Sequence, residues 1–191
     1  MDELDRRILI ETIRLGSQDR NEKTFSINDI AKNLSLSEND ILSRFPSRSS
    51  LIEKATEMAF TSEMRYLDDL NNRSLSFEAW TNRVLDYFIF HKEETFFVLN
   101  FGKGLARASL SGADLQQYHD SMTYWGKRIL CYFALSSDEE YFFVWSATFR
   151  SFVYAAANIM RGEYLDMPEN RKFLATLIGH GVNSFMKGPR L

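Results

Sequence analysis

The stretch SINDIAKNLSLSENDILSRFPSRSSL, residues 26–51, predicts two short helices joined by a tight turn, followed by the start of a longer helix. Ser26 and Ser37 are residues of the type that caps a helix N-terminus by accepting a backbone hydrogen bond. An aspartate follows each serine by three residues, where its carboxylate can bind the backbone N–H of the capping serine. We therefore expect short helices over about residues 27–33 and 38–44.

Helical spacing of apolar residues continues through the rest of the 191-residue chain, and no run of strand alternation is convincing. Leu4, Ile8 and Leu15 share one face of a first helix. A long helix over about residues 48–71 is expected to bridge to a second region. Further helices are expected from about residue 77, near 95–101, over about 115–132, over about 138–161 and over about 168–187.

These patterns predict an all-α fold of about nine helices. A three-helix domain over residues 1–50 contains the two short helices and their turn. The long helix joins it to a larger helical domain over residues 51–191.

Composition and charge exclude several classes of protein. The formal net charge of -3 excludes bulk attraction to nucleic acid as a mode of binding, so any such contact must depend on a few placed side chains. Cys131 is the sole cysteine, which leaves no intrachain disulfide. The N-terminus is charged where a signal peptide would be apolar, so the cytoplasm is the expected compartment. No stretch approaches the ~18 uncharged apolar residues of a membrane-spanning helix.

The register of residues 26–51 matches a known pattern without a gap. Its matching residues are Ser26, Ile30, Ala31, Leu36, Ser37, Ile41, Phe45, Ser47, Arg48 and Leu51. On these residues the segment from 8 to 51 resembles the N-terminal domain of the TetR/AcrR family of bacterial transcriptional regulators. Three residues depart from the family pattern: Ser35 and Asn39 replace glycines, and Leu42 replaces a tyrosine that usually meets a phosphate.

The resemblance implies contacts with a double-stranded DNA operator through the short helices and the start of the long one. The residues that it assigns to these contacts are Ser26, Asn28, Ser37, Asn39, Asp40, Ser43, Arg44 and Arg48. Arg48 matches the family's phosphate-binding lysine, and Arg44 and Asn28 could bind base edges or phosphate. Glu38 and Asp40 have two interpretations: they complement the helix dipole, or they accept hydrogen bonds from cytosine amino groups.

Large aromatic residues in the second region form either a packed core or the lining of a cavity. The resemblance implies a pocket for a small-molecule effector among the middle helices. The expected lining is Trp80, Phe88, Phe97, Phe101, Tyr118, Met122, Trp125 and Phe149, which suits an apolar or aromatic ligand. We also expect a homodimer through the last two long helices, where small residues permit close approach and large ones supply apolar area: Ala155, Ala156, Ala157 and Gly181, and Phe149, Phe152, Leu177 and Phe185.

No arrangement of residues indicates an enzyme, a metal site or a cofactor. His91, His119 and His180 are isolated in the sequence, and the GKG segment at 102–104 lacks the other residues of a phosphate loop. The resemblance implies a ligand-responsive DNA-binding regulator, and we expect a repressor that its effector releases from the operator. The alternative is a protein of this fold that has lost DNA binding and binds a ligand or a partner protein.

Overall fold

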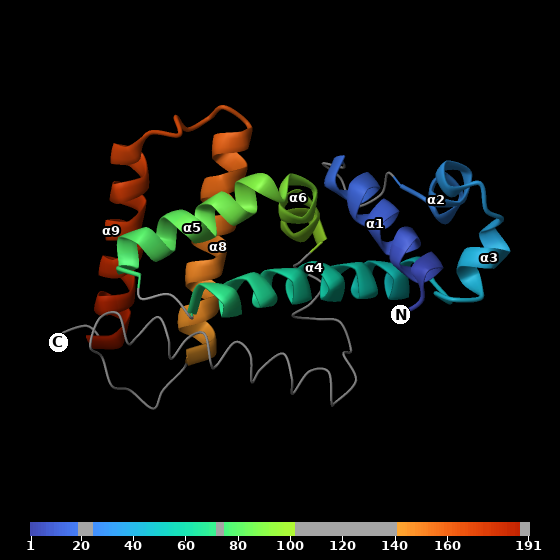
Figure 1. Ribbon diagram of the computed structural model, residues 1–191, viewed down its shortest axis with the longest axis horizontal. Coiled ribbons are helices and arrows are strands. Elements are labelled where there is room, and N and C mark those ends of the chain that lie inside the picture. Colours follow the sequence, from blue (N-terminus) through green and yellow to red (C-terminus); the bar gives the residue numbers. More distant parts are fainter. Residues whose placement is uncertain (19–24, 72–74, 102–140, 188–191) are drawn as a thin grey trace. The chain divides into compact units, whose positions relative to one another are not determined.

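The structure, a computed structural model, describes residues 1–18, 25–71, 75–101 and 141–187. Within these ranges the chain forms helices and connecting turns, with no strand, so the predicted all-α fold class is confirmed (Figure 1). The helices are α1 (Glu3–Gln18), α2 (Ile27–Leu34), α3 (Glu38–Leu42), α4 (Arg48–Asn71), α5 (Phe77–Phe90), α6 (Lys92–Phe101), α8 (Tyr141–Met160) and α9 (Pro168–Lys187). No helix among them has the length and apolar character needed to cross a membrane. The helix expected over about 115–132 lies outside the described residues.

The described chain forms two compact units. Unit 1 contains α1, α2, α3, the part of α4 that ends at Tyr66, and α6. Unit 2 contains the end of α4 from Leu67, together with α5, α8 and α9. The boundary expected at residue 50 falls inside unit 1, because most of α4 belongs to that unit.

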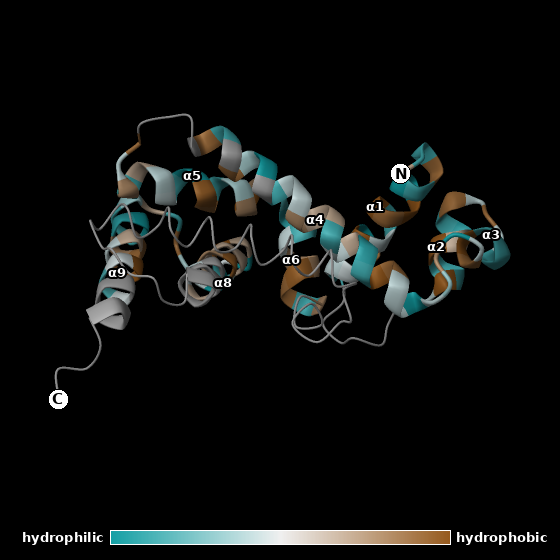
Figure 2. Ribbon diagram, turned by 90° about the horizontal axis from the view of Figure 1, so that it is seen from below, coloured by the Kyte–Doolittle hydropathy of each residue, from teal (hydrophilic) through white to brown (hydrophobic). Residues whose placement is uncertain are grey.

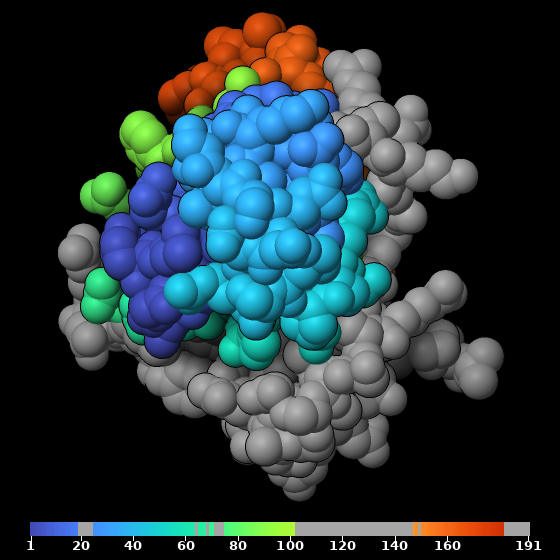
Figure 3. All heavy atoms as spheres, turned by 90° about the vertical axis from the view of Figure 1, so that its right-hand side faces the viewer, coloured from blue at the N-terminus to red at the C-terminus, as the bar shows by residue number. Residues whose placement is uncertain are grey.

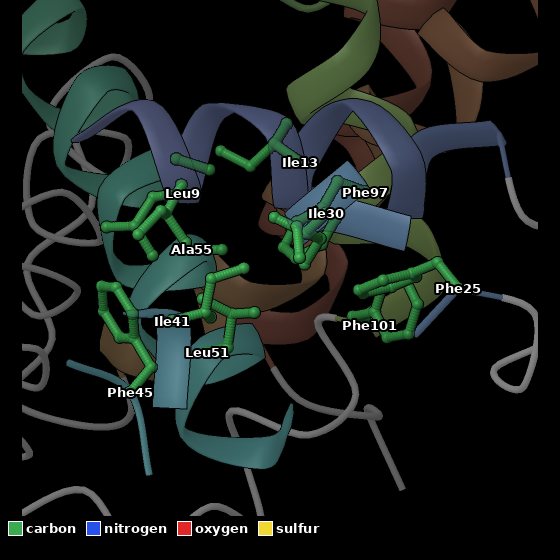
Figure 4. Close-up of a cluster of buried hydrophobic side chains, with 13 residues drawn as sticks. Leu9, Ile13, Phe25, Ile30, Ile41, Phe45, Leu51, Ala55, Phe97 and Phe101 are labelled. Carbon is green, nitrogen blue, oxygen red and sulfur yellow. The ribbon is translucent and has the colours of Figure 1, made fainter. Parts of the chain in front are cut away.

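The core of unit 1 joins segments that are far apart in the sequence. Figure 2 shows hydrophobic residues recurring between hydrophilic ones along α1 and α4, as expected for helices with one buried face. The buried residues of this core are Ile8, Leu9, Ile13, Phe25, Ile30, Ala31, Ile41, Phe45, Leu51, Ala55, Ala59, Phe97 and Phe101 (Figure 4). The last two come from α6, which packs along α1.

A glycine allows α1 and α6 to approach closely. A Cβ atom built on Gly16 would lie 2.6 Å from Cδ2 of Phe97 and 2.9 Å from Cε2 of Phe101. The Asn100 side chain donates a hydrogen bond to the carbonyl oxygen of Gly16 at 3.0 Å. The aromatic rings of α6 thus occupy the space that a side chain at position 16 would need.

Unit 2 packs α5 against α8 and α9. Trp80 of α5 and Phe152 of α8 meet edge to face, with ring centroids 5.7 Å apart. Arg171 of α9 donates hydrogen bonds to Asp86 of α5 at 2.6 Å and to both carboxylate oxygens of Asp166 at 2.5 and 2.8 Å. This ion-pair cluster links α5 to α9 and to the turn that precedes α9.

Candidate nucleic-acid interface

The segment from α2 to α3 has the geometry of a helix-turn-helix. Ile30 and Ala31 of α2 and Ile41 of α3 are buried, so the small Ala31 lets the two helices approach closely. The N–H of Leu36 donates to the carbonyl oxygen of Ala31 at 2.8 Å and closes the turn. Ser35 adopts φ 57° and ψ 42°, a left-handed conformation that favours glycine. Ser35 is the one described non-glycine residue with a positive φ, so the turn holds a serine in a conformation that glycine adopts more readily.

The serines at the helix starts act as predicted. The Ser26 hydroxyl accepts a hydrogen bond from the N–H of Asp29 at 3.2 Å, and the Asp29 carboxylate accepts one from the N–H of Ser26 at 2.8 Å. The same reciprocal pair joins Ser37 and Asp40, at 3.2 and 2.9 Å. Both helices therefore have complete capping boxes, which set where α2 and α3 begin.

The capping box accounts for Asp40. Its Oδ2 atom accepts hydrogen bonds from the hydroxyl and the N–H of Ser37, and these bonds hold the pKa of Asp40 below its ordinary value. The dipole and capping interpretation is therefore sufficient for this acid. Glu38, in the first turn of α3, is exposed, and its carboxylate binds no described side chain.

The predicted contact residues lie on α2, on α3 and at the start of α4. Arg48 is half-buried and the others are exposed: Ser26, Asn28, Ser37, Asn39, Asp40, Ser43 and Arg44. Figure 3 shows the face of unit 1 that α1, α2 and α3 form with the start of α4. These side chains therefore belong to one helix-turn-helix with its capped termini.

Arg44 is held by acids that the sequence analysis missed. Its Nη1 atom donates to Asp2 at 2.5 Å and to Asp5 at 2.7 Å, both at the start of α1. Hydrogen bonds from the N–H of Asp5 and from Arg44 lower the pKa of Asp2. No described residue binds the Nε or Nη2 atoms of Arg44, so part of the guanidinium is available to a ligand. A DNA phosphate at Nη1 would have to compete with two carboxylates.

Arg48 is part of the packing of unit 1. Its Nε atom donates to the carbonyl oxygen of Phe25 at 3.1 Å, and its guanidinium lies 4.6 Å from the centre of the Phe25 ring. The Phe101 ring of α6 lies 5.9 Å from the same guanidinium. The two rings meet edge to face, with their centroids 5.8 Å apart. The start of α4 is thus connected through one side chain to the loop before α2 and to the end of α6.

The residues expected to line an effector pocket fall in different units or outside the described residues. Trp80 and Phe88 are buried in unit 2, whereas Phe97 and Phe101 belong to the core of unit 1. Tyr118, Met122 and Trp125 lie outside the described residues, as does the side chain of Phe149. For Phe97 and Phe101, packing against α1 and Phe25 explains their aromatic character without a ligand.

A cavity of about 660 Å³ lies within unit 2, and its lining includes none of the residues that the sequence analysis expected around a pocket. Its lining includes Leu85 of α5, Tyr154 of α8, Tyr164 of the α8–α9 turn, and Phe173 and Leu177 of α9. All but Leu85 are large exposed hydrophobic residues. Apolar residues off the buried face of each helix are the sequence signal that could have revealed this surface.

The described histidines do not form a metal site. Nδ1 of His91 lies 2.6 Å from a carboxylate oxygen of Glu94, and His180 is exposed on α9. Across the described ranges, no group of three or more histidine, cysteine, aspartate or glutamate side chains could hold a metal ion. His119 lies outside these ranges.

Comparison with solved structures finds a similar chain in the crystal structure of a TetR-like transcriptional regulator from Rhodococcus sp. RHA1. The TM-score is 0.63 at 14% sequence identity, and the match covers 94% of this chain and 95% of the other. No family model and no curated protein matches the sequence. The structural match extends over both units, and it shows a shared fold.

Proposed function

We propose that this chain, which has the fold of a TetR-like transcriptional regulator, is itself a DNA-binding transcriptional regulator. The observation that carries the proposal is the helix-turn-helix of α2 and α3, whose capped starts and exposed polar residues occupy the register expected of such a regulator. In this proposal α3 enters a major groove, where Asn39, Ser43 and Arg44 reach base edges or phosphates.

The charges of the interface support selective and weak binding. Arg44 shares its Nη1 atom with two aspartates, and Arg48 is engaged by Phe25. Lys32 is an exposed cation on α2. Few cations are therefore available to displace the counterions of DNA, so we expect a shallow dependence of affinity on salt.

A homodimer would place two such interfaces on one operator. The exposed hydrophobic residues of α8, α9 and their connecting turn support an interface with a second copy across the cavity of unit 2. Ala155, Ala156 and Ala157, which were expected to allow close approach between copies, are buried in the single chain, and Ala155 lines the cavity. The side chains expected to form the interface are thus Tyr154, Phe173 and Leu177.

The regulatory step that we propose is release from the operator on binding of a small effector. The helix α4 runs from Arg48 in unit 1 to Asn71 in unit 2, so a ligand that shifts α4 also shifts the start of the helix beside α3. Two recognition helices must stay ~34–36 Å apart to enter successive major grooves of one face of DNA. A change in this separation on binding of the effector would weaken operator binding. We therefore propose that the protein is a repressor that its effector releases.

Fluorescence anisotropy tests the proposal directly. Labelled duplexes from the region upstream of the protein's own gene are titrated with the protein at low salt, with random duplex as competitor. Arg44→Ala should weaken operator binding by about tenfold or more, because a specific arginine contact is worth about 1–3 kcal/mol. The control Lys172→Ala, an exposed cation on α9, should bind as the parent does.

A second function is favoured by the internal engagement of Arg44 and Arg48. A protein with these contacts and with Glu38 exposed on α3 could keep the fold and bind a ligand or a partner protein without DNA. The test uses the parent and the double variant Glu38→Gln with Asp40→Asn, each with DNA fragments from the gene's neighbourhood at low salt. If neither protein binds any fragment, the second function is favoured.

A further inference from the structure

The helix α4 has one buried stripe, and an acid interrupts it. Its apolar members recur every three or four residues: Leu51, Ala55, Ala59, Leu67 and Leu70. Glu63 occupies the position between Ala59 and Leu67, and it is 4% exposed. An ionisable side chain at such a position is rarely buried unless it is paired.

One oxygen of the Glu63 carboxyl, Oε1, is buried and has no hydrogen-bond partner among the residues that the structure describes. Three other buried polar residues of unit 1 differ, since Glu11 accepts hydrogen bonds from Arg14, and Thr12 and Thr56 donate to backbone carbonyls of their own helices. Within the described ranges Glu63 therefore joins no ion pair, and its Oε1 atom accepts no hydrogen bond.

Burial at this position opposes the charged carboxylate. Desolvation raises the pKa of Glu63 well above its ordinary value. A buried acid without a partner destabilises the fold, and such groups concentrate at functional sites, where the partner arrives as a ligand. A leucine or alanine here would continue the stripe, so packing alone does not explain the acid.

We propose that Glu63 is the anchor for the effector of this protein, and that the effector is an apolar organic cation such as an alkyl or aryl ammonium. A buried carboxyl pairs with positive charge and disfavours an anion, while Ala59 and Leu67 on either side favour a hydrocarbon body. This inference rests on the proposed function, because it names the class of effector that regulates it.

The position of Glu63 suits a regulatory ligand. It lies on α4 within unit 1, one turn before Leu67, where the helix passes into unit 2. The same helix begins with Arg48, which binds the loop before α2. An ammonium held by Glu63 therefore acts on the element that both units share.

Calorimetric titration with three probes of matched shape tests the inference without DNA. The probes are 2-naphthylmethylammonium, the neutral 2-naphthylmethanol and the anionic 2-naphthoate. The parent should bind the ammonium at least about tenfold more tightly than the alcohol, because a charge-assisted hydrogen bond in a desolvated site is a strong one. In Glu63→Gln the preference should fall to about twofold or less. Glu57→Gln, the same substitution at a half-buried glutamate of α4 that pairs with Lys54, should retain it.

Thermal unfolding gives a second test, because a purely structural role for Glu63 and a ligand-binding role predict opposite changes in Tm on substitution. Glu63→Leu should raise Tm by about 2 °C or more in the absence of ligand, since it replaces an unpaired buried acid by an apolar residue. A lower Tm for this variant would mean that the carboxyl stabilises the fold, and it would overturn the inference. Equal or weaker binding of the ammonium than of the alcohol by the parent would overturn it as well.

The two proposals fail separately. If the parent binds operator DNA but shows no preference for the ammonium, the inference is wrong and the proposed function stands. If the ammonium binds through Glu63 but no DNA fragment binds, Glu63 is confirmed as a ligand site and the proposed function is wrong.

Discussion

Substitution of Gly16 by alanine tests the close packing of α1 against α6. A Cβ atom at this position would lie 2.6 and 2.7 Å from two atoms of the Phe97 ring and 2.9 Å from the Phe101 ring. Both rings are buried in the core of unit 1, so neither can turn aside into solvent. The methyl group must therefore displace α6 or force the rings into unfavourable rotamers.

Two opposing terms determine the size of the effect. Alanine in place of glycine in a helix stabilises by about 1 kcal/mol, and overpacking a well-packed core costs about 1–3 kcal/mol. We expect Gly16→Ala to lower the free energy of unfolding by about 1 kcal/mol, which corresponds to a Tm lower by about 2–4 °C for a chain of this size. Urea denaturation followed by circular dichroism measures the first quantity, and a thermal scan measures the second.

A double-mutant cycle identifies the clash as the cause. Phe97→Leu removes the ring atoms that the new methyl group would meet, so the two substitutions together should cost about 1 kcal/mol less than the sum of their separate effects. If Gly16→Ala instead stabilises the protein by the full helical gain of about 1 kcal/mol, then α1 and α6 are not packed at these distances.

Two further predictions concern the proposed DNA-binding and dimer surfaces. Asp2→Asn combined with Asp5→Asn should free Arg44 and raise affinity for random duplex. The slope of log affinity against log salt should steepen by about 0.9, for one added phosphate contact. Anisotropy at several salt concentrations measures the slope, and an unchanged slope would show that the two acids do not restrain the arginine. Leu177→Glu should convert a dimer to a species of 22.3 kDa in sedimentation, because a charge replaces an apolar side chain that is 57% exposed; Thr176→Glu, its exposed neighbour on α9, is the matched control, and a dimer that survives the leucine substitution would exclude this face.

Local sequence signals predicted the helices well. Ser26 and Ser37 cap α2 and α3 because each needs only its own hydroxyl and an aspartate three residues later. The long helix α4 begins and ends where its apolar spacing predicted, and Pro168 starts α9. These features depend on residues within a turn or two of each other, so a single sequence contains what determines them.

The partners of each apolar face could not be predicted in the same way. Spacing shows that Phe97 and Phe101 lie on an apolar helix, but not that this helix meets α1 and Phe25 of unit 1. Arg44 pairs with Asp2 across 42 positions of the sequence, a distance over which no local pattern operates. Glu63 is different, because an acid in a stripe of leucine and alanine was visible in the sequence and went unrecognised.

The placement of α6 has a consequence for how such a protein can evolve. The chain leaves unit 1 at Leu67, contributes α5 to unit 2, and returns to unit 1 with α6. A recombination event near residue 66 would replace α1 by that of another protein but keep α6. The Phe97 ring of α6 fits against a glycine at position 16, which the new α1 would need to have. Each unit consists of two separate segments of the chain, so exchange of one continuous segment does not transfer a whole unit. Under the proposed function, substitutions on the exposed faces of α2 and α3 would change operator specificity while the α1–α6 contact is retained.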